Sequence, residues 1–140
     1  SNPVDCDACQ GVPFPQRINH AMKENNEIKR ALQRSVIELC TLAIIAQNEA
    51  YTNDIMRILH DNDIIAVEGS IYPLLSSLKK AGILSSRLEE SFQGPARKYY
   101  SLTEEGRTYY TSLCEIWGGL ESSVNRLIEG IATDKTEEGK

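Results

Sequence analysis

The sequence lacks the long apolar runs, the paired cysteines and the N-terminal leader that mark membrane and secreted proteins. No run approaches the ~18 apolar residues that a membrane-spanning helix needs, and the chain does not begin with a basic segment followed by an apolar one. Its 4 cysteines include only one close pair, which is too few for a disulfide framework. We therefore expect a reduced protein that lies in the cytoplasm and does not bind a membrane.

The chain also lacks the motifs of the common catalytic sites. It has no glycine-rich phosphate loop, no His-Glu-x-x-His motif and no acid/base cluster. No nucleophile can be assigned from the sequence as a catalytic partner of either of its 2 histidines. Cys6-x-x-Cys9, with His20 downstream, resembles half of a zinc site or a redox pair, but the second ligand pair is missing. We expect no enzymatic activity, no cofactor and no metal.

Size and charge limit what remains. A chain of 140 residues with 41% hydrophobic and 25% charged residues is one globular domain with room for a tail. The net charge of −5 is uneven: residues 1–69 carry −4, residues 70–110 carry +2 and residues 111–140 carry −3. Because salt screens charges over about 8–10 Å, a local positive region permits DNA binding even in an acidic protein.

The sequence divides into four segments. Residues 1–21 contain several prolines and predict a mobile tail, and Ser1-Asn2 resembles a cloning remnant. A domain of helices and a hairpin is expected over residues 22–102, a single long helix over residues 103–131 and a frayed end over residues 132–140. These bounds place all of the regular structure in the last five-sixths of the chain.

Apolar spacing predicts three helices in the domain. The first runs without interruption from about Glu27 to Asn48 and is apolar all round in its second half, so it requires burial on two sides, the second of them against another subunit. A second helix is expected from about Asn53 to His60, with Thr52 as its N-cap. The third is expected from about Ser70 to Ala81, with Pro73 in its first turn, Gly82 as its C′ residue and Ile71, Leu74, Leu75 and Leu78 on its core face.

The period then changes from helical to two, which predicts a β-hairpin. Its strands are expected at Leu84–Phe92 and Arg97–Leu102, joined by the loop Gln93-Gly94-Pro95-Ala96. In this arrangement Arg97 and Lys98 lie beside the hairpin tip.

A last helix follows, with Thr103 as its N-cap and apolar residues at alternating spacings of three and four. Each fully buried aliphatic side chain contributes roughly 1.5–3 kcal/mol, so such a stripe requires a partner. We predict a homodimer whose interface contains Leu113, Trp117, Leu120, Val124, Leu127 and Ile131.

Three helices followed by a hairpin is the order of a winged helix-turn-helix. The predicted fold class is therefore mostly α with a β-hairpin wing, plus a C-terminal dimerisation helix. A helix fits the major groove, and cations on a wing hold the flanking phosphates, so the expected partner is double-stranded DNA. A winged-helix module that binds protein instead of DNA is an alternative, which the negative net charge favours.

The segments GSIYPLLSSLKKAGIL and GPARKYYSLTEEGR resemble the PadR family of transcriptional regulators. The first is similar to the Gly-Thr-Leu-Tyr-Pro-Leu-Leu motif of the family's recognition helix, with Ser70 in place of threonine, and the second to its Tyr-Tyr-x-Leu-Thr-x-x-Gly wing motif. Ser77 stands where a basic residue is common, and Pro95-Ala96 interrupt a longer basic run. The likeness covers about residues 28–130, and the single helix after the wing resembles the small PadR subgroup.

The order of elements and the resemblance together give a set of DNA contacts. Its members are polar, aromatic or basic residues at the start of the second helix, on the outer face of the third and on the wing. Lys79 is the least specific, because the helix dipole alone explains a cation near a helix C-terminus. The predicted contacts are Thr52, Asn53, Ser70, Tyr72, Pro73, Ser76, Lys79, Arg97 and Lys98.

The resemblance also implies a ligand site, because the multidrug-binding members of that subgroup hold flat aromatic ligands between two tryptophans at the dimer centre. Trp117 falls at that position, and Gly118-Gly119 follow it at a cost of about 1 kcal/mol each relative to alanine. Interface packing is the alternative interpretation of this tryptophan. The implied pocket residues are Leu39, Ala43, Tyr110, Leu113, Cys114, Trp117 and Glu121, of which the last favours a cationic ligand.

These patterns predict a homodimeric repressor on a pseudo-palindromic operator, with a planar aromatic effector between its subunits. Such a ligand would change the angle between the last helices and so the spacing of the two recognition helices. A constitutive repressor with a filled dimer centre is the second alternative.

Overall fold

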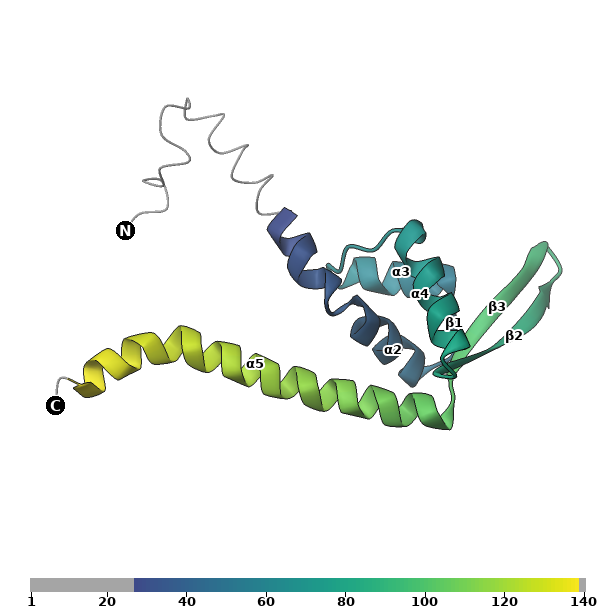
Figure 1. Cartoon of the computed structure of the whole chain (residues 1–140). Helices are drawn as coiled ribbons and strands as arrows, with labels where there is room; N and C mark the ends of the chain where they lie inside the picture. The colour runs from purple at the N-terminus through teal and green to yellow at the C-terminus, as the bar shows by residue number, and fades with distance from the viewer. Residues whose placement is uncertain (1–26, 139–140) are drawn as a thin grey trace, which may run out of the picture. The chain divides into compact units, whose positions relative to one another are not determined.

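The structure is a computed structural model that describes the backbone of residues 27–138 and the side chains of residues 27–130. It is mostly helical with one small antiparallel sheet, which confirms the expected winged-helix class (Figure 1). The chain divides into two compact units, residues 1–37 and residues 38–140. In the first unit a helix covers residues 27–34, and the second contains the helix-turn-helix, the wing and the C-terminal helix. None of the described helices is long and apolar enough to cross a membrane.

The expected continuous helix from Glu27 to Asn48 is wrong, because the chain turns at residues 35–36 and a new helix, α2, covers Ile37–Gln47. The Ser35 hydroxyl donates to the Leu32 carbonyl at 2.9 Å, and the Val36 N–H donates to the Gln33 carbonyl at 2.9 Å. A serine side chain that bonds the backbone in this way competes with the helical hydrogen bonds. The apolar stripe continues across the turn, so the spacing gave no sign of it.

The helix-turn-helix is formed by α3, Thr52–Asp61, and α4, Glu68–Lys80. The prediction that Thr52 is the N-cap of α3 is wrong. The N-cap is Tyr51, whose side chain makes no capping hydrogen bond. Helix α4 begins two residues earlier than expected, so Pro73 lies in the second turn instead of the first. There it has no N–H to donate to the carbonyl of Gly69, the residue four positions before it.

The end of α4 confirms Gly82 as the C′ residue. Its φ is +80°, its N–H donates to the Lys79 carbonyl at 3.1 Å, and the Ile83 N–H donates to the Leu78 carbonyl at 2.9 Å. This pair of bonds is the Schellman motif, which satisfies carbonyls that the last helical turn leaves free. The chain leaves α4 directly into the wing.

The wing is a hairpin of β2, Leu84–Ser91, and β3, Gly94–Leu102, to which the two-residue strand β1, Ala50–Tyr51, adds in the order β1-β3-β2. The expected loop is wrong: Gly94, Pro95 and Ala96 belong to β3, and Phe92-Gln93 form the turn. Arg97 pairs with Glu89 and Lys98 with Leu88, so these cations lie along the strand and not beside the tip.

The core lies where α2, α3, α4 and the base of the sheet meet. The least exposed large side chains include Leu42, Ile55, Leu59, Ile71 and Leu75. The sheet adds two more, Leu84 and Tyr100. Leu74, which we expected on this face, is half-buried. The core therefore fixes the direction of α4 and the base of the wing, while the outer part of the hairpin extends away from it (Figure 1).

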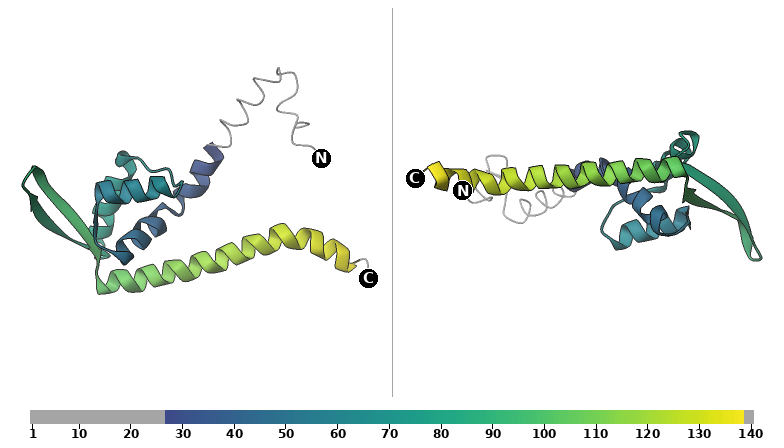
Figure 2. Two further views of the ribbon diagram at one scale, coloured as in Figure 1. Left: turned by 180° about the vertical axis from the view of Figure 1, so that it is seen from behind. Right: turned by 90° about the horizontal axis from the view of Figure 1, so that it is seen from below.

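The C-terminal helix α5, Glu104–Glu138, runs past residue 131, where we expected it to end. Thr103 is its N-cap, as predicted, because the Gly106 N–H donates to the Thr103 hydroxyl at 2.9 Å. The Thr103 N–H in turn donates to the Ile83 carbonyl at 3.1 Å. The first turn of α5 is thereby joined to the base of the hairpin (Figure 2).

Candidate nucleic-acid interface

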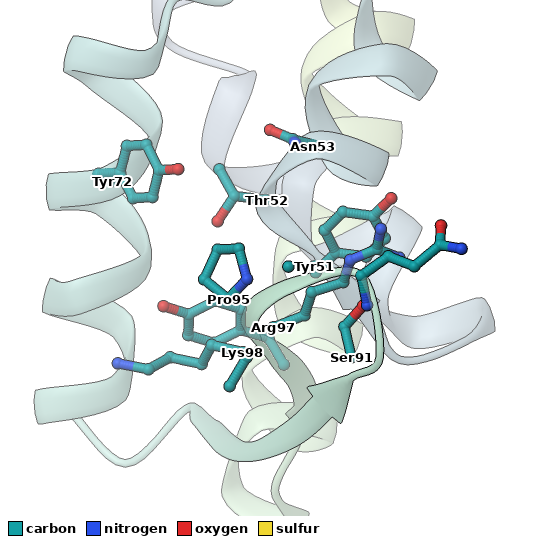
Figure 3. Close-up of a pocket in the computed structure, with 12 residues that line it drawn as sticks. Tyr51, Thr52, Asn53, Tyr72, Ser91, Pro95, Arg97 and Lys98 are labelled. Atoms are coloured by element: carbon teal, nitrogen blue, oxygen red, sulfur yellow. The ribbon is translucent and has the colours of Figure 1, made fainter.

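A hollow of about 630 Å³ lies between the wing, the start of α3 and α4 (Figure 3). We call it the wing hollow. It brings together five of the predicted DNA contacts, which come from three separate elements. Its lining residues are Tyr51, Thr52, Asn53, Tyr72, Ser91, Gln93, Gly94, Pro95, Ala96, Arg97, Lys98 and Tyr100.

Helix α4 forms one wall of the wing hollow and presents its polar face to solvent. The buried residues Ile71, Leu75 and Leu78 follow spacings of four and three, and Tyr72, half of whose surface is exposed, projects to the side toward the hollow. The predicted residues Ser70, Pro73, Ser76 and Lys79 are all exposed. The structure therefore places every predicted α4 contact where a ligand can reach it.

The predicted contacts omit two exposed residues of this face, Gly69 and Lys80. Gly69, Pro73, Ser76 and Lys80 follow spacings of four, three and four, which puts them on the side of α4 opposite its buried stripe. Lys80 therefore lies nearer the centre of the exposed face than Lys79. The signal was available in the sequence, since the same spacing defines the core stripe.

The start of α3 forms the second wall. Thr52 is only 8% exposed and its side chain lies in the wall, whereas Asn53 is exposed. Because Tyr51 provides no side-chain cap, the first N–H groups of α3 keep their capacity to bind an anion. A helix N-terminus of this kind adds a partial positive charge to the hollow.

The wing supplies the cations, from its two opposite faces. Lys98 shares a face with Tyr100 and points toward α4, whereas Arg97 lies on the other face with its guanidinium carbon 4.8 Å from the centroid of the Tyr51 ring (Figure 3). Both cations are exposed. Burial, together with the nearby Tyr72, raises the pKa of Tyr100, so this hydroxyl stays neutral at physiological pH.

The residues predicted to form the ligand pocket and the dimer interface lie on α2 and α5, away from the wing hollow. In this single chain α5 exposes an apolar stripe, with Trp117 42%, Leu120 54% and Leu127 67% exposed. Val124 is also exposed, Leu113 is half-buried, and the Ile131 side chain lies outside the described residues. Ile116 and Ile128, which the seam prediction omitted, are exposed too and widen the stripe.

Around Trp117 the implied pocket residues divide between the two helices. Leu39 and Ala43 are half-buried on α2, and Tyr110 is half-buried on α5, where Cys114 and Glu121 are exposed. Interaction with the Cys114 thiol, together with burial, raises the pKa of Tyr110. Nearby, the Tyr109 hydroxyl donates to the Glu38 carboxylate at 3.0 Å and joins α5 to α2.

Among the described residues no three His, Cys, Asp or Glu side chains are grouped for a metal ion. Cys6, Cys9 and His20 lie outside the described residues. Cys40 is half-buried on α2, and burial raises the pKa of its thiol, which keeps it protonated.

Comparison with known proteins gives consistent matches. The model of the transcriptional regulator PadR-like family matches residues 41–112. The chain is similar to the PadR-like transcription factor from Bacteroides fragilis, with 37% identity, a TM-score of 0.61 and coverage of 72% of this chain and 98% of that one. It is also similar to a PadR-like transcriptional regulator from Bacillus cereus, with 33% identity, a TM-score of 0.62 and coverage of 70% and 96%. A PadR family regulator from Eggerthella lenta shares the fold at 24% identity, with a TM-score of 0.71 and coverage of 79% and 96%.

Proposed function

The chain belongs to the PadR-like family of transcriptional regulators, and from this premise we propose that it is a repressor that binds a pseudo-palindromic operator as a homodimer. The family consists of transcriptional regulators, so the protein is a DNA-binding regulator and not an enzyme. As a regulator of transcription it would act in the cytoplasm. Its DNA-binding surface, its assembly and its response to a ligand are the parts that we propose.

The observation that supports the DNA-binding surface is the wing hollow beside the exposed face of α4. In our proposal α4 enters the major groove, where Tyr72, Ser76 and Lys80 reach base edges. The adjoining sugar-phosphate strand lies in the hollow, between Lys98 on the wing and the N–H groups at the start of α3. Arg97 binds a phosphate at the outer side of the wing.

The exposed stripe on α5 supports the homodimer. A helix that exposes Trp117, Leu120, Val124 and Leu127 on one side loses stabilisation unless a second apolar surface covers it. The heptad spacing of these residues fits a second copy of the same helix. Two recognition helices related by such an interface would read two half-sites that are one or more helical turns apart.

The glycines next to Trp117 support an effector site. Apart from the adjoining residues and the nearby backbone of α5 itself, no described residue lies within 4 Å of a Cβ built at Gly118 or at Gly119, so packing among the described residues does not require either glycine. Two mid-helix glycines that cost helix stability then serve a neighbouring subunit or a ligand. We propose a planar aromatic cation, held between the two Trp117 rings and near Glu121, that shifts the spacing of the recognition helices.

Gel retardation on duplexes from the DNA upstream of the encoding gene tests the surface. We expect Tyr72→Ala and the pair Arg97→Gln/Lys98→Gln to lose the retarded band. Arg126→Gln, which removes one cation from α5, should keep it. Sedimentation should show a dimer that Leu120→Asp converts to monomers. Unchanged retardation in the first two variants would reject the assigned surface.

Fluorescence of Trp117, the single tryptophan, tests the effector and separates it from a constitutive repressor. Titration with planar aromatic cations such as ethidium should quench the emission, and Glu121→Gln should weaken the binding of the cation but not of a neutral planar analogue. A flat titration would favour the constitutive alternative, with a filled dimer centre.

A further inference from the structure

The wing carries two arginines on one face, and their surroundings differ. In the β2–β3 register Arg97 lies opposite Glu89, and Arg87 lies opposite Tyr99. Because side chains alternate along a strand, both arginines project from the same side of the sheet, together with Tyr51 of β1. The sequence provides two cations there, but the structure gives them different partners.

Arg87 is fully engaged with carboxylates. Its guanidinium binds Glu49 through two nitrogens, with Nε 2.9 Å from Oε2 and Nη2 on Oε1. Its Nη1 donates to Glu89 Oε2 at 3.3 Å, and its guanidinium carbon is 4.8 Å from the centroid of the Tyr99 ring. The hydrogen bond with Arg87 lowers the pKa of Glu49, so both members of this pair stay charged at neutral pH.

Arg97 has no carboxylate partner among the described residues, although Glu89 is directly opposite it. Its guanidinium lies instead over the ring of Tyr51, which packs edge-on against Tyr99 with the two ring centroids 5.4 Å apart. A cation over an aromatic face keeps its full charge and its N–H donors. Arg97 is thus oriented by a ring and still able to bind an anion.

The contrast between the two arginines has one electrostatic cause. Opposite charges that face each other across two strands attract, so Glu89 would pair with Arg97 if nothing else held it. In this structure the Glu89 carboxylate forms its ion pair with Arg87 instead of Arg97, and Arg87 also pairs with Glu49. We propose that Arg87 is a positioning residue for DNA binding: it sequesters Glu49 and Glu89 and thereby keeps Arg97 free for a phosphate.

This inference rests on the proposed function in one respect, the contact between Arg97 and a phosphate. It goes beyond it, because it assigns a role in DNA binding to a residue that never touches DNA. Without Arg87, a phosphate has to displace Glu89 from Arg97. Loss of Arg87 should then weaken DNA binding through Arg97 alone.

The test uses the full chain and a random-sequence DNA duplex, because phosphate contacts do not depend on sequence. Binding is measured by fluorescence anisotropy over a range of salt concentrations. Arg97→Gln should weaken binding and reduce the slope of log K against log salt by about 0.9, the value for one phosphate contact. Arg87→Gln should weaken binding by about two- to fivefold, the range expected for one exposed ion pair.

Two double variants distinguish positioning from direct contact. In Arg87→Gln/Arg97→Gln the loss should equal that of Arg97→Gln alone, because Arg87 acts only through Arg97. Arg87→Gln/Glu89→Gln should recover most of the lost affinity. Its matched control is Arg87→Gln/Glu90→Gln, which removes the same charge from the next residue and should recover much less.

Each outcome decides between the two proposals. If Arg97→Gln binds like the unmodified chain, the phosphate contact is wrong and the positioning role is wrong with it. A second outcome is that Arg97→Gln weakens binding and that Arg87→Gln/Arg97→Gln weakens it further, with a further decrease in the salt slope. Arg87 would then bind DNA itself, and only the positioning role would be overturned. The positioning role would also be overturned if Arg87→Gln/Glu90→Gln recovered as much affinity as Arg87→Gln/Glu89→Gln. Circular dichroism of each variant checks that the wing domain is folded.

Discussion

Gly106 in the first turn of α5 lies against the main-chain carbonyl of Ile83, at the base of the wing. A Cβ built at Gly106 would be 2.0 Å from the Ile83 carbonyl oxygen, a distance that no real side chain tolerates. The same carbonyl accepts the Thr103 N–H at 3.1 Å. The Leu-Thr-x-x-Gly motif therefore has a physical cause: threonine caps α5, and glycine lets that helix approach the turn that ends α4.

The first prediction follows from this contact. Gly106→Ala should lower the free energy of unfolding by about 3 kcal/mol, the upper part of the range for overpacking, because the neighbour is backbone and not a flexible side chain. Urea denaturation at fixed protein concentration measures the change.

Gly69→Ala is the matched control for that variant. A Cβ at Gly69, in the first turn of α4, would have no described residue within 4 Å apart from the adjoining residues and the nearby backbone of its own helix. Helix propensity should therefore make this variant as stable as the unmodified chain or more stable by up to about 1 kcal/mol. Equal losses in both variants would show that the close approach at Gly106 does not matter.

The sequence predicted the elements whose signals are local. Helices α3, α4 and α5 were found because their apolar spacing extends over several turns, and Gly82 and Thr103 were found because their capping chemistry is specific. Strand β1 has two residues and exists only because Ala50 and Tyr51 pair with β3, which no local pattern indicates. The contact between Tyr51 and Arg97 depends on the same pairing, so it could not be predicted from the sequence either.

The position of the hairpin turn shows a different limit. Glycine and proline at 94 and 95 are typical of a loop, and we predicted one there. The chain instead turns at Phe92-Gln93, and an irregularity between Glu89 and Ser91 shifts the register. Pairing of Gly94 and of residues 97–102 with β2 outweighs the local preference, which places Arg97 and Lys98 in the strand.

The second prediction concerns Thr41, which is fully buried on α2. Its hydroxyl oxygen finds no hydrogen-bond partner among the described residues. A buried hydroxyl without a partner costs free energy, so Thr41→Val, which replaces it by a methyl group, should raise the free energy of unfolding by about 1 kcal/mol. Thr41→Ser keeps the hydroxyl and loses a methyl, and should lower the free energy of unfolding by about 1 kcal/mol. Loss of stability in the valine variant would indicate a partner for this hydroxyl.

The third prediction concerns pH and the pair of Glu49 and Arg87. In the folded chain the hydrogen bond with Arg87 lowers the pKa of Glu49 below its ordinary value of 4.5. The pair therefore adds stability above pH 4.5, and this contribution is lost as the pH falls through the lower pKa of the folded state. The difference in unfolding free energy between the unmodified chain and Glu49→Gln should shrink on acidification. Glu90→Gln is the control, and a Glu49 difference that stays constant with pH would contradict the assignment.

The last prediction compares two neighbouring lysines at the end of α4. Lys80 continues the exposed line of Gly69, Pro73 and Ser76, while Lys79 lies to one side of it, on the side of Tyr72, so Lys80 is nearer the centre of the face that would enter the groove. Lys80→Gln should weaken binding to an upstream duplex by about 1–3 kcal/mol, and Lys79→Gln by less. The two variants remove the same charge from adjacent positions, so net charge and helix dipole affect both alike. A larger loss for Lys79→Gln would mean that α4 is rotated in the groove toward the wing hollow, and Tyr72, on that side of the helix, would then carry more of the base recognition than Ser76.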